Sequence, residues 1–225
     1  MGKVLGDVLG YAAGVMISPL PIIAMILVLA TPRGRLGGSV FAIGWVVGLS
    51  ALGAVMLAIG GPGGASADGQ PATWVGGLKL GLGVLLALFG VRLWHRRPRG
   101  VSQVELPKWM GAIDRFTPVK ILGLALLLSA ANVKNAAFTV AASASISSSG
   151  IPVGEQIAAL AVFVVIASLG VLAPLAVFLV AGERARSTLS GWKNWAAQHN
   201  TAVMAVLCFV IGLKLLGDGI AVLAA

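Results

Sequence analysis

One lysine lies in the middle of a long apolar run, where a charged side chain is costly. Lys134 falls about midway along residues 119–143, with Asn132 and Asn135 beside it. A basic residue at the centre of a membrane helix costs about 2.5–3.5 kcal/mol on insertion scales. An ammonium flanked by amides suits an anion or a lipid headgroup. In the other interpretation, Lys134 is structural and bonds backbone carbonyls that are free in a neighbouring broken helix.

A second unusual stretch, Ser18-Pro19-Leu20-Pro21, lies inside the first apolar run, residues 4–30. Each proline removes a backbone N–H donor and clashes with the preceding helical turn. In a membrane, the freed carbonyls are tolerated only where they face protein or a wet cavity. We therefore expect a break near mid-bilayer, and broken helices form the substrate site in many secondary transporters. Ser18 either bonds carbonyls at the break or contacts a ligand.

Further charges fall inside apolar runs. Lys214 and Asp218 are four residues apart, so they share one helix face and can pair. Lys79 lies in another apolar run, toward the same outer side as Asp7. These residues form either a gating or coupling network, or a satisfied ion pair with lysines that reach to the membrane surface. We expect Asp7 to be solvated.

The composition is that of a membrane protein. Of the 225 residues, 58% are hydrophobic and only 10% are charged, against about 25% charged residues in soluble domains. A span needs roughly 20 apolar residues. We expect an all-α integral membrane protein with six transmembrane helices, the first and fourth of them broken. The runs are residues 4–30, 36–60, 73–94, 119–143, 154–181 and 201–223.

The residue types that enzymes use are scarce. The only cysteine, Cys208, lies in an apolar run, and the two histidines, His95 and His199, fall at the ends of spans. Paired buried carboxylates, metal-ligand clusters and phosphate-binding glycine loops are not found in the sequence. We expect no enzyme activity, catalytic residue, metal or cofactor, and no nucleic-acid partner.

Basic residues predict the orientation. They gather in the connections 31–35, 92–120 and 183–193, whereas 61–72 and 144–153 have none. The positive-inside rule then places the first set in the cytoplasm and both termini outside the plasma membrane. The first apolar run is too long for a signal peptide, so we expect it to remain as a span.

The central connection, residues 95–118, is the longest and the most basic. Trp109, Met110, Ile113 and Phe116 fall on one face at helical spacing, which favours a short amphipathic helix on the membrane surface over a plain loop. Near residues 183–193, a polar loop is expected, with Trp192 and Trp195 as interface anchors.

The two halves of the chain share a pattern. The third run ends with Gly90-Val91-Arg92-Leu93, and the sixth contains Gly212-Leu213-Lys214-Leu215. Three spans in each half make the halves inverted relative to each other, a transporter design in which paired broken helices meet at mid-membrane. We expect residues 1–94 and 119–225 to be the two repeats, with 95–118 as the cytoplasmic connector.

These motifs resemble a known superfamily. Ser18-Pro19-Leu20-Pro21 and Gly34-Arg35-x-x-Gly38 are similar to the Pro-Gly-Pro and Gly-Arg-x-x-Gly signatures of lysine exporters. Asn132-Val133-Lys134-Asn135 resembles their Asn-Pro-Lys element. The stretch 107–118, together with 127–132, is most similar to the GAP family, the peptidoglycolipid or sulfolipid addressing proteins. Leu20 and Val133 depart from the pattern, and Val133 in place of proline predicts a milder break in the fourth span.

The resemblance implies a plasma-membrane protein that moves cell-envelope glycolipids outward, with Ser18, Pro19, Pro21, Asn132, Lys134 and Asn135 at the substrate site. Two alternatives remain. One is a proton-driven exporter of a small solute, such as an amino acid or ion, with Asp218 as its best proton carrier. The other is an accessory subunit of a lipid-export machine, docked through the basic connector. Membrane lipids, and a homodimer or export machinery, are the partners expected.

Overall fold

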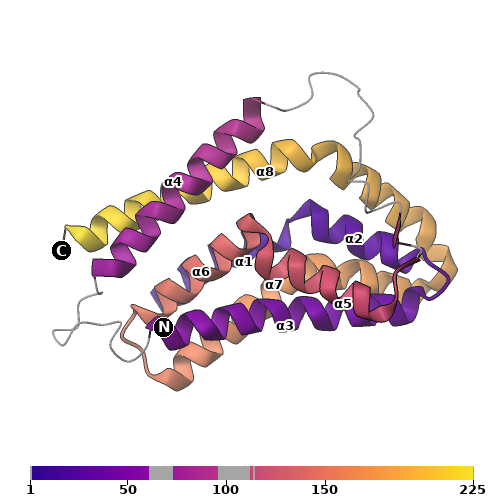
Figure 1. The fold of residues 1–225 in the computed structure, drawn as a ribbon, viewed down its shortest axis with the longest axis horizontal. Helices are drawn as coiled ribbons and strands as arrows, with labels where there is room; N and C mark the ends of the chain where they lie inside the picture. Colours follow the sequence, from indigo (N-terminus) through magenta and orange to yellow (C-terminus); the bar gives the residue numbers. More distant parts are fainter. Residues whose placement is uncertain (1, 61–72, 96–111, 114, 225) are drawn as a thin grey trace.

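The computed structural model describes residues 2–60, 73–95, 112–113, 115–224, and all its long elements are helices (Figure 1). A short 3₁₀ turn, Gly182–Arg184, precedes the last helix, and residues Leu127–Ala131 form a π-helical turn. The helices are α1 Gly2–Met16, α2 Pro19–Leu29, α3 Gly34–Gly60, α4 Thr73–His95, α5 Pro118–Leu126, α6 Val133–Ser147, α7 Val153–Ala181 and α8 Ala185–Leu223.

The lengths of the helices fit a protein that crosses a membrane several times. Within the described ranges, four segments are long and apolar enough to span: α3, α4, α7 and the part of α8 from Thr201 to Leu223. Two further pairs pass the same test together but are bent, α1 with α2 by 50° and Pro118–Ala131 with α6 by 57°. Counting each bent pair as one span gives up to six.

Both predicted breaks are present, but the relative sharpness predicted for them is wrong. The break before Val133 bends the chain by 57°, compared with 50° at Pro19, although Val133 has the N–H that a proline lacks. A π-helical turn ends the first half of the fourth span. Asn132 then caps α6 by accepting a hydrogen bond from the N–H of Lys134, 3.2 Å away. A polar cap therefore breaks this helix without a proline.

The polar loop expected near residues 183–193 is instead largely helical. After the 3₁₀ turn Gly182–Arg184, α8 continues from Ala185 into the last span. The first part of α8 is amphipathic: Leu189 and Ala196 are buried, and Ala196 packs with Ile23 of α2. Burial of this face explains why a segment rich in polar residues remains a helix.

The predicted surface helix in the central connection lies mostly outside the described residues. Of its four apolar residues, Trp109 and Met110 fall in the range that is not described. Ile113 is 3% exposed, and Phe116 packs against the same core. These two side chains therefore contact the helix bundle.

The third span, α4, and the last span, in α8, form a tightly packed pair. In Figure 1, α4 (purple) and α8 (orange to yellow) lie side by side and run antiparallel. A Cβ on Gly90 would lie 2.9 Å from the backbone nitrogen of Phe209, and one on Gly212 would lie 2.7 Å from that of Ala87. Glycines at such positions let membrane helices approach closely. The two glycines that carry the sequence repeat are thus packing positions.

Candidate functional site

The proline break frees a backbone carbonyl in α1. Pro19 has no N–H to offer the carbonyl of Val15, so the N–H of Ser18 bonds that oxygen at 3.0 Å. Ser18 would otherwise donate to Gly14, four residues earlier, as in any α-helix. The carbonyl oxygen of Gly14 therefore lacks its helical donor.

Lys134 supplies the missing donor from the other broken span. Its Nζ lies 2.7 Å from the carbonyl oxygen of Gly14, and the side chain is 1% exposed. The ammonium also lies 5.5 Å from the centre of the Phe138 ring, a cation–π distance. Neither contact carries a countercharge, so these contacts leave the positive charge of Lys134 unneutralised within the bundle.

The second break is bonded in a corresponding way. Nδ2 of Asn135 donates to the carbonyl oxygen of Leu128 at 2.8 Å. Leu128 stands four residues before Asn132, just as Gly14 stands four before Ser18. The two cap residues also share a backbone conformation, with φ −69° and ψ 110° at Ser18 and φ −69° and ψ 119° at Asn132. Neighbouring residues of α6 thus satisfy a carbonyl at each break.

Several polar atoms near the breaks have no hydrogen-bond partner among the described residues. They include Oγ of Ser18, Oδ1 of Asn135 and Oγ of Ser168, and all three side chains are buried. Ser168 lies on α7 two residues before Gly170, where an added Cβ would clash with the carbonyl oxygen of Met16. A buried polar atom without a partner costs about 1–3 kcal/mol, and water or a ligand commonly explains it.

The predicted site residues therefore meet through one contact. Pro19 and Pro21 are buried at the first break together with Ser18. Lys134 reaches that break from the second one, whereas the side-chain oxygen of Asn132 bonds within its own helix as a cap. Sequence reasoning had no signal that identified Gly14 or Phe138, because a helical glycine and a core phenylalanine look ordinary.

A second polar group joins α1 to α8 near the chain termini. Nζ of Lys214 lies 2.9 Å from Oδ1 of Asp7 and 2.8 Å from Oδ2 of Asp218. The hydroxyl of Tyr11 donates to Asp218 at 3.3 Å, and Lys214 lies 5.1 Å from the centre of the Tyr11 ring. Asp7 keeps 32% of its side chain exposed, but it is not solely solvated as expected, because it pairs with a lysine 207 residues away. Nothing local in the sequence indicates this pairing, because Lys214 lies in the other half of the chain.

Lys79 lies on α4, the helix that packs against α8. It is only 7% exposed, and it has an interaction of its own. Lys79 is a buried residue of the α4–α8 side of the molecule.

Three cavities formed by the described residues lie away from the breaks. An apolar groove of about 360 Å³ runs between α4 and α8, bordered by Val91, Trp94, Val206 and Phe209. A basic pocket of about 280 Å³, lined by Arg33 and Arg115 among others, lies where α3 and α5 begin. Ligand pockets commonly measure about 300–1,000 Å³.

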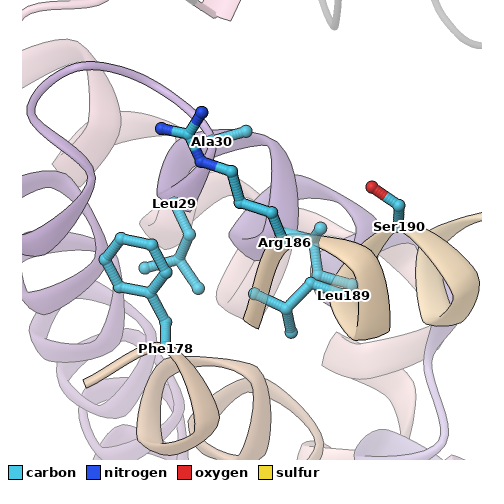
Figure 2. A pocket seen from close by; sticks show the side chains of 7 residues that line it. Leu29, Ala30, Phe178, Arg186, Leu189 and Ser190 are labelled. Atoms are coloured by element: carbon cyan, nitrogen blue, oxygen red, sulfur yellow. The ribbon is translucent and has the colours of Figure 1, made fainter. Parts of the chain in front are cut away.

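The third cavity measures about 100 Å³ and lies between α2, α7 and the first turns of α8 (Figure 2). Leu29, Phe178 and Leu189 form its apolar wall, and the side chain of Arg186 extends past them toward Ala30. Its volume is too small for a lipid chain.

Comparison with known proteins identifies the family. The family model of Sap, the sulfolipid-1-addressing protein, matches residues 8–221, nearly the whole chain. Comparisons with curated proteins and with solved structures gave no match. The match confirms the predicted addressing-protein family, while membership of the lysine-exporter superfamily stays a prediction. The chain, in which a lysine-bearing broken helix packs against a proline-broken one, therefore belongs to the sulfolipid-1-addressing protein family.

Proposed function

We propose that this protein moves an anionic cell-envelope lipid or glycolipid across the plasma membrane, and that the two helix breaks form its substrate site. The observation that carries the proposal is the contact between Lys134 and Gly14. It joins both breaks through a buried cation that has no countercharge among its described contacts. The family match supports lipid as the substrate class. The protein acts as a transporter and not as an enzyme.

An anionic headgroup would compete with the Gly14 carbonyl for the ammonium of Lys134. A sulfate or phosphate ester carries a full negative charge, so it attracts the ammonium more strongly than a neutral carbonyl does. The N-terminal end of α6, which begins beside Asn132, adds a partial positive charge at the same place. Release of Gly14 would remove a hydrogen bond between α1 and α6. Headgroup binding would therefore loosen the contact that joins the two broken spans.

The proposal includes an inverted repeat, and the matching geometry of the two breaks supports it. The breaks at Ser18 and Asn132 share cap geometry and a bonded carbonyl four residues earlier. In each half a glycine of the following span faces the break of the other half. An added Cβ on Gly48 would clash with Ser129, and one on Gly170 would clash with Met16. Residues 1–94 and 119–225 are the two repeats, and motion of one against the other would alternate access to the site.

Lys214 and its two carboxylates form the outer gate in this scheme. They link α1 to α8 beyond Tyr11, on the side where both termini lie outside the cell by the positive-inside rule. Separation of Lys214 from Asp7 would let α8 move away from α1. Lys79, on the partner helix α4, would move with α8.

The apolar groove between α4 and α8 would hold an acyl chain. Its border residues Val91, Val206 and Phe209 are between 41% and 51% exposed on the protein surface. In a membrane such a surface faces lipid, so a chain can enter from the side. A lateral apolar groove is the feature that favours a lipid over the small solute of the alternative exporter model.

Reconstitution of the purified protein into liposomes tests the proposal. The wild-type protein, without any partner protein, should move a fluorescent anionic phospholipid between the leaflets. Lys134→Ala should lower the rate of this movement about tenfold or more. Lys120→Ala is the matched control, because Lys120 is an exposed lysine at the start of the same broken span. Absence of movement with the wild-type protein alone would contradict the proposal and favour an accessory role in a larger export machine.

A further inference from the structure

The basic pocket lies where two spans begin. Its walls come from the turn before α3, the start of α3, the residues before α5 and the first turn of α5. A Cβ on Gly37 would lie 2.8 Å from Val28 and 3.1 Å from Ile121. The helices α2, α3 and α5 are therefore tightly packed beneath the pocket, which gives its walls a fixed geometry.

The lining combines two guanidinium groups with an apolar wall. Arg33 and Arg115 come from segments far apart in the sequence, and both are exposed. Between them lie apolar side chains, among them Leu36, Phe116 and Ile121. Guanidinium groups bind sulfate and phosphate esters in a bidentate manner. The lining therefore matches an amphiphile with an anionic head and an apolar tail.

Backbone charge at the pocket favours the same ligand. α3 begins at Gly34 and α5 begins at Pro118, so the N-terminal ends of both helices lie at the pocket. The N-terminus of a helix carries a partial positive charge. The N–H of Lys120 already donates to Thr117 and that of Gly34 to the carbonyl of Thr31, so the ends contribute charge more than free donors. These charges add to those of Arg33 and Arg115 and lie at the end of the spans, where lipid headgroups are found.

We propose that this pocket binds the sulfate or phosphate headgroup of an anionic lipid at the cytoplasmic surface. Its use as a loading station for lipid on the way to Lys134 rests on the proposed function, whereas binding itself does not. The apolar wall distinguishes a lipid from a free anion, because only a lipid gains from contact with Leu36, Phe116 and Ile121.

Lipid binding to the protein in phosphatidylcholine nanodiscs tests the proposal, with fluorescent phosphatidylglycerol as the probe. Arg33→Ala with Arg115→Ala should weaken its binding at least about tenfold. Arg35→Ala with Lys120→Ala is the matched control, since it removes the same charge from exposed residues of α3 and α5 outside the pocket. The control should bind within about twofold of wild type. Equal weakening by both pairs would overturn the proposal in favour of diffuse surface charge.

Two further measurements identify the ligand. Inorganic sulfate and phosphate should compete at least about tenfold more weakly than the lipid, and Leu36→Ser should weaken lipid binding while leaving the competition by sulfate unchanged. Equal affinity for the free anions would overturn the lipid assignment. Leu36 is 54% exposed, so its replacement is not expected to disturb the fold.

The same assay separates this inference from the proposed function. Lys134→Ala should keep wild-type binding at the Arg33–Arg115 pocket even though it slows lipid movement in liposomes. If the Arg33→Ala, Arg115→Ala protein binds lipid as tightly as wild type and still moves it, the pocket assignment is wrong and the proposed function stands. If the wild-type protein binds lipid at the pocket but does not move it, the pocket assignment stands and the proposed function is wrong.

Discussion

The ammonium of Lys134 lies 2.7 Å from the carbonyl oxygen of Gly14, 120 residues earlier in the chain. The contact gives Lys134 two roles at once. It satisfies a carbonyl that the Pro19 break leaves without its helical donor, and it places a buried positive charge where the two broken spans meet. The structural and functional interpretations of this lysine are therefore compatible, and substitutions can separate them.

Asn135 should contribute to stability through its bond to Leu128. Asn135→Ala removes the donor to the Leu128 carbonyl and leaves that buried oxygen unpaired, which should cost about 1–3 kcal/mol. The free energy of unfolding in detergent measures the loss. Asn194→Ala, at an exposed position of α8, is the control and should change stability by less than about 0.5 kcal/mol. Equal stability of the two variants would show that the second break needs no side-chain donor.

The close contact of α4 and α8 should tolerate no side chain at Gly212. Gly212→Ala places a Cβ against the backbone of Ala87 and should destabilise the protein by about 1–3 kcal/mol. Gly217→Ala is the control on the same helix, because its Cβ would have no heavy atom within 4 Å. Alanine is a better helix former than glycine, so that variant should match or slightly exceed wild type in thermal stability. A reversed order would contradict the helix pairing.

The Lys214 network should restrict access from outside. With Cys208→Ala removing the native thiol, Val15→Cys should react slowly with an impermeant maleimide, since Val15 is 1% exposed and lies one turn below Tyr11. Lys214→Ala breaks both ion pairs, so labelling of Val15→Cys should become at least about threefold faster. Arg92→Ala is the control, because Arg92 lies in the last turn of α4 and takes no part in the Lys214 network. Unchanged labelling in the Lys214 variant would show that the network is not part of an outer gate.

The orientation predicted by the basic residues can be tested with single cysteines. In a Cys208→Ala background, Ser149→Cys lies in the uncharged connection before α7, and Ser187→Cys lies near the start of α8. An impermeant reagent added to intact cells should label Ser149→Cys and not Ser187→Cys. Labelling of Ser187→Cys alone would reverse the orientation, and with it the side of the membrane assigned to each pocket.

The sequence predicted the features that depend on local chemistry. Prolines at 19 and 21 predict the first break because their effect on a helix is local. The sharpness of the second break was not predictable, because it depends on a π-helical turn and on the bond from Asn135 to Leu128. Composition alone was sufficient to identify a membrane protein.

Contacts between residues far apart in the chain could not be predicted, because the sequence indicates only local structure. Asp7 was expected to be solvated, because its partner Lys214 lies 207 residues away and nothing local indicates their contact. Arg33 and Arg115 likewise meet only through the packing of α3 against α5. The start of α8 was mistaken for a loop because its polar residues are conspicuous, whereas its buried face is formed by small and apolar side chains such as Ala196.

The most direct test replaces Lys134 with a residue that keeps a hydrogen-bond donor but not the charge. Lys134→Gln should retain most of the stability, since an amide can still donate toward Gly14, and should lower lipid movement in liposomes at least about tenfold. Lys120→Gln, the exposed control on α5, should move lipid at the wild-type rate. If Lys134→Gln also moves lipid at the wild-type rate, the charge at the crossing of the two breaks has no part in transport, and the central claim is wrong.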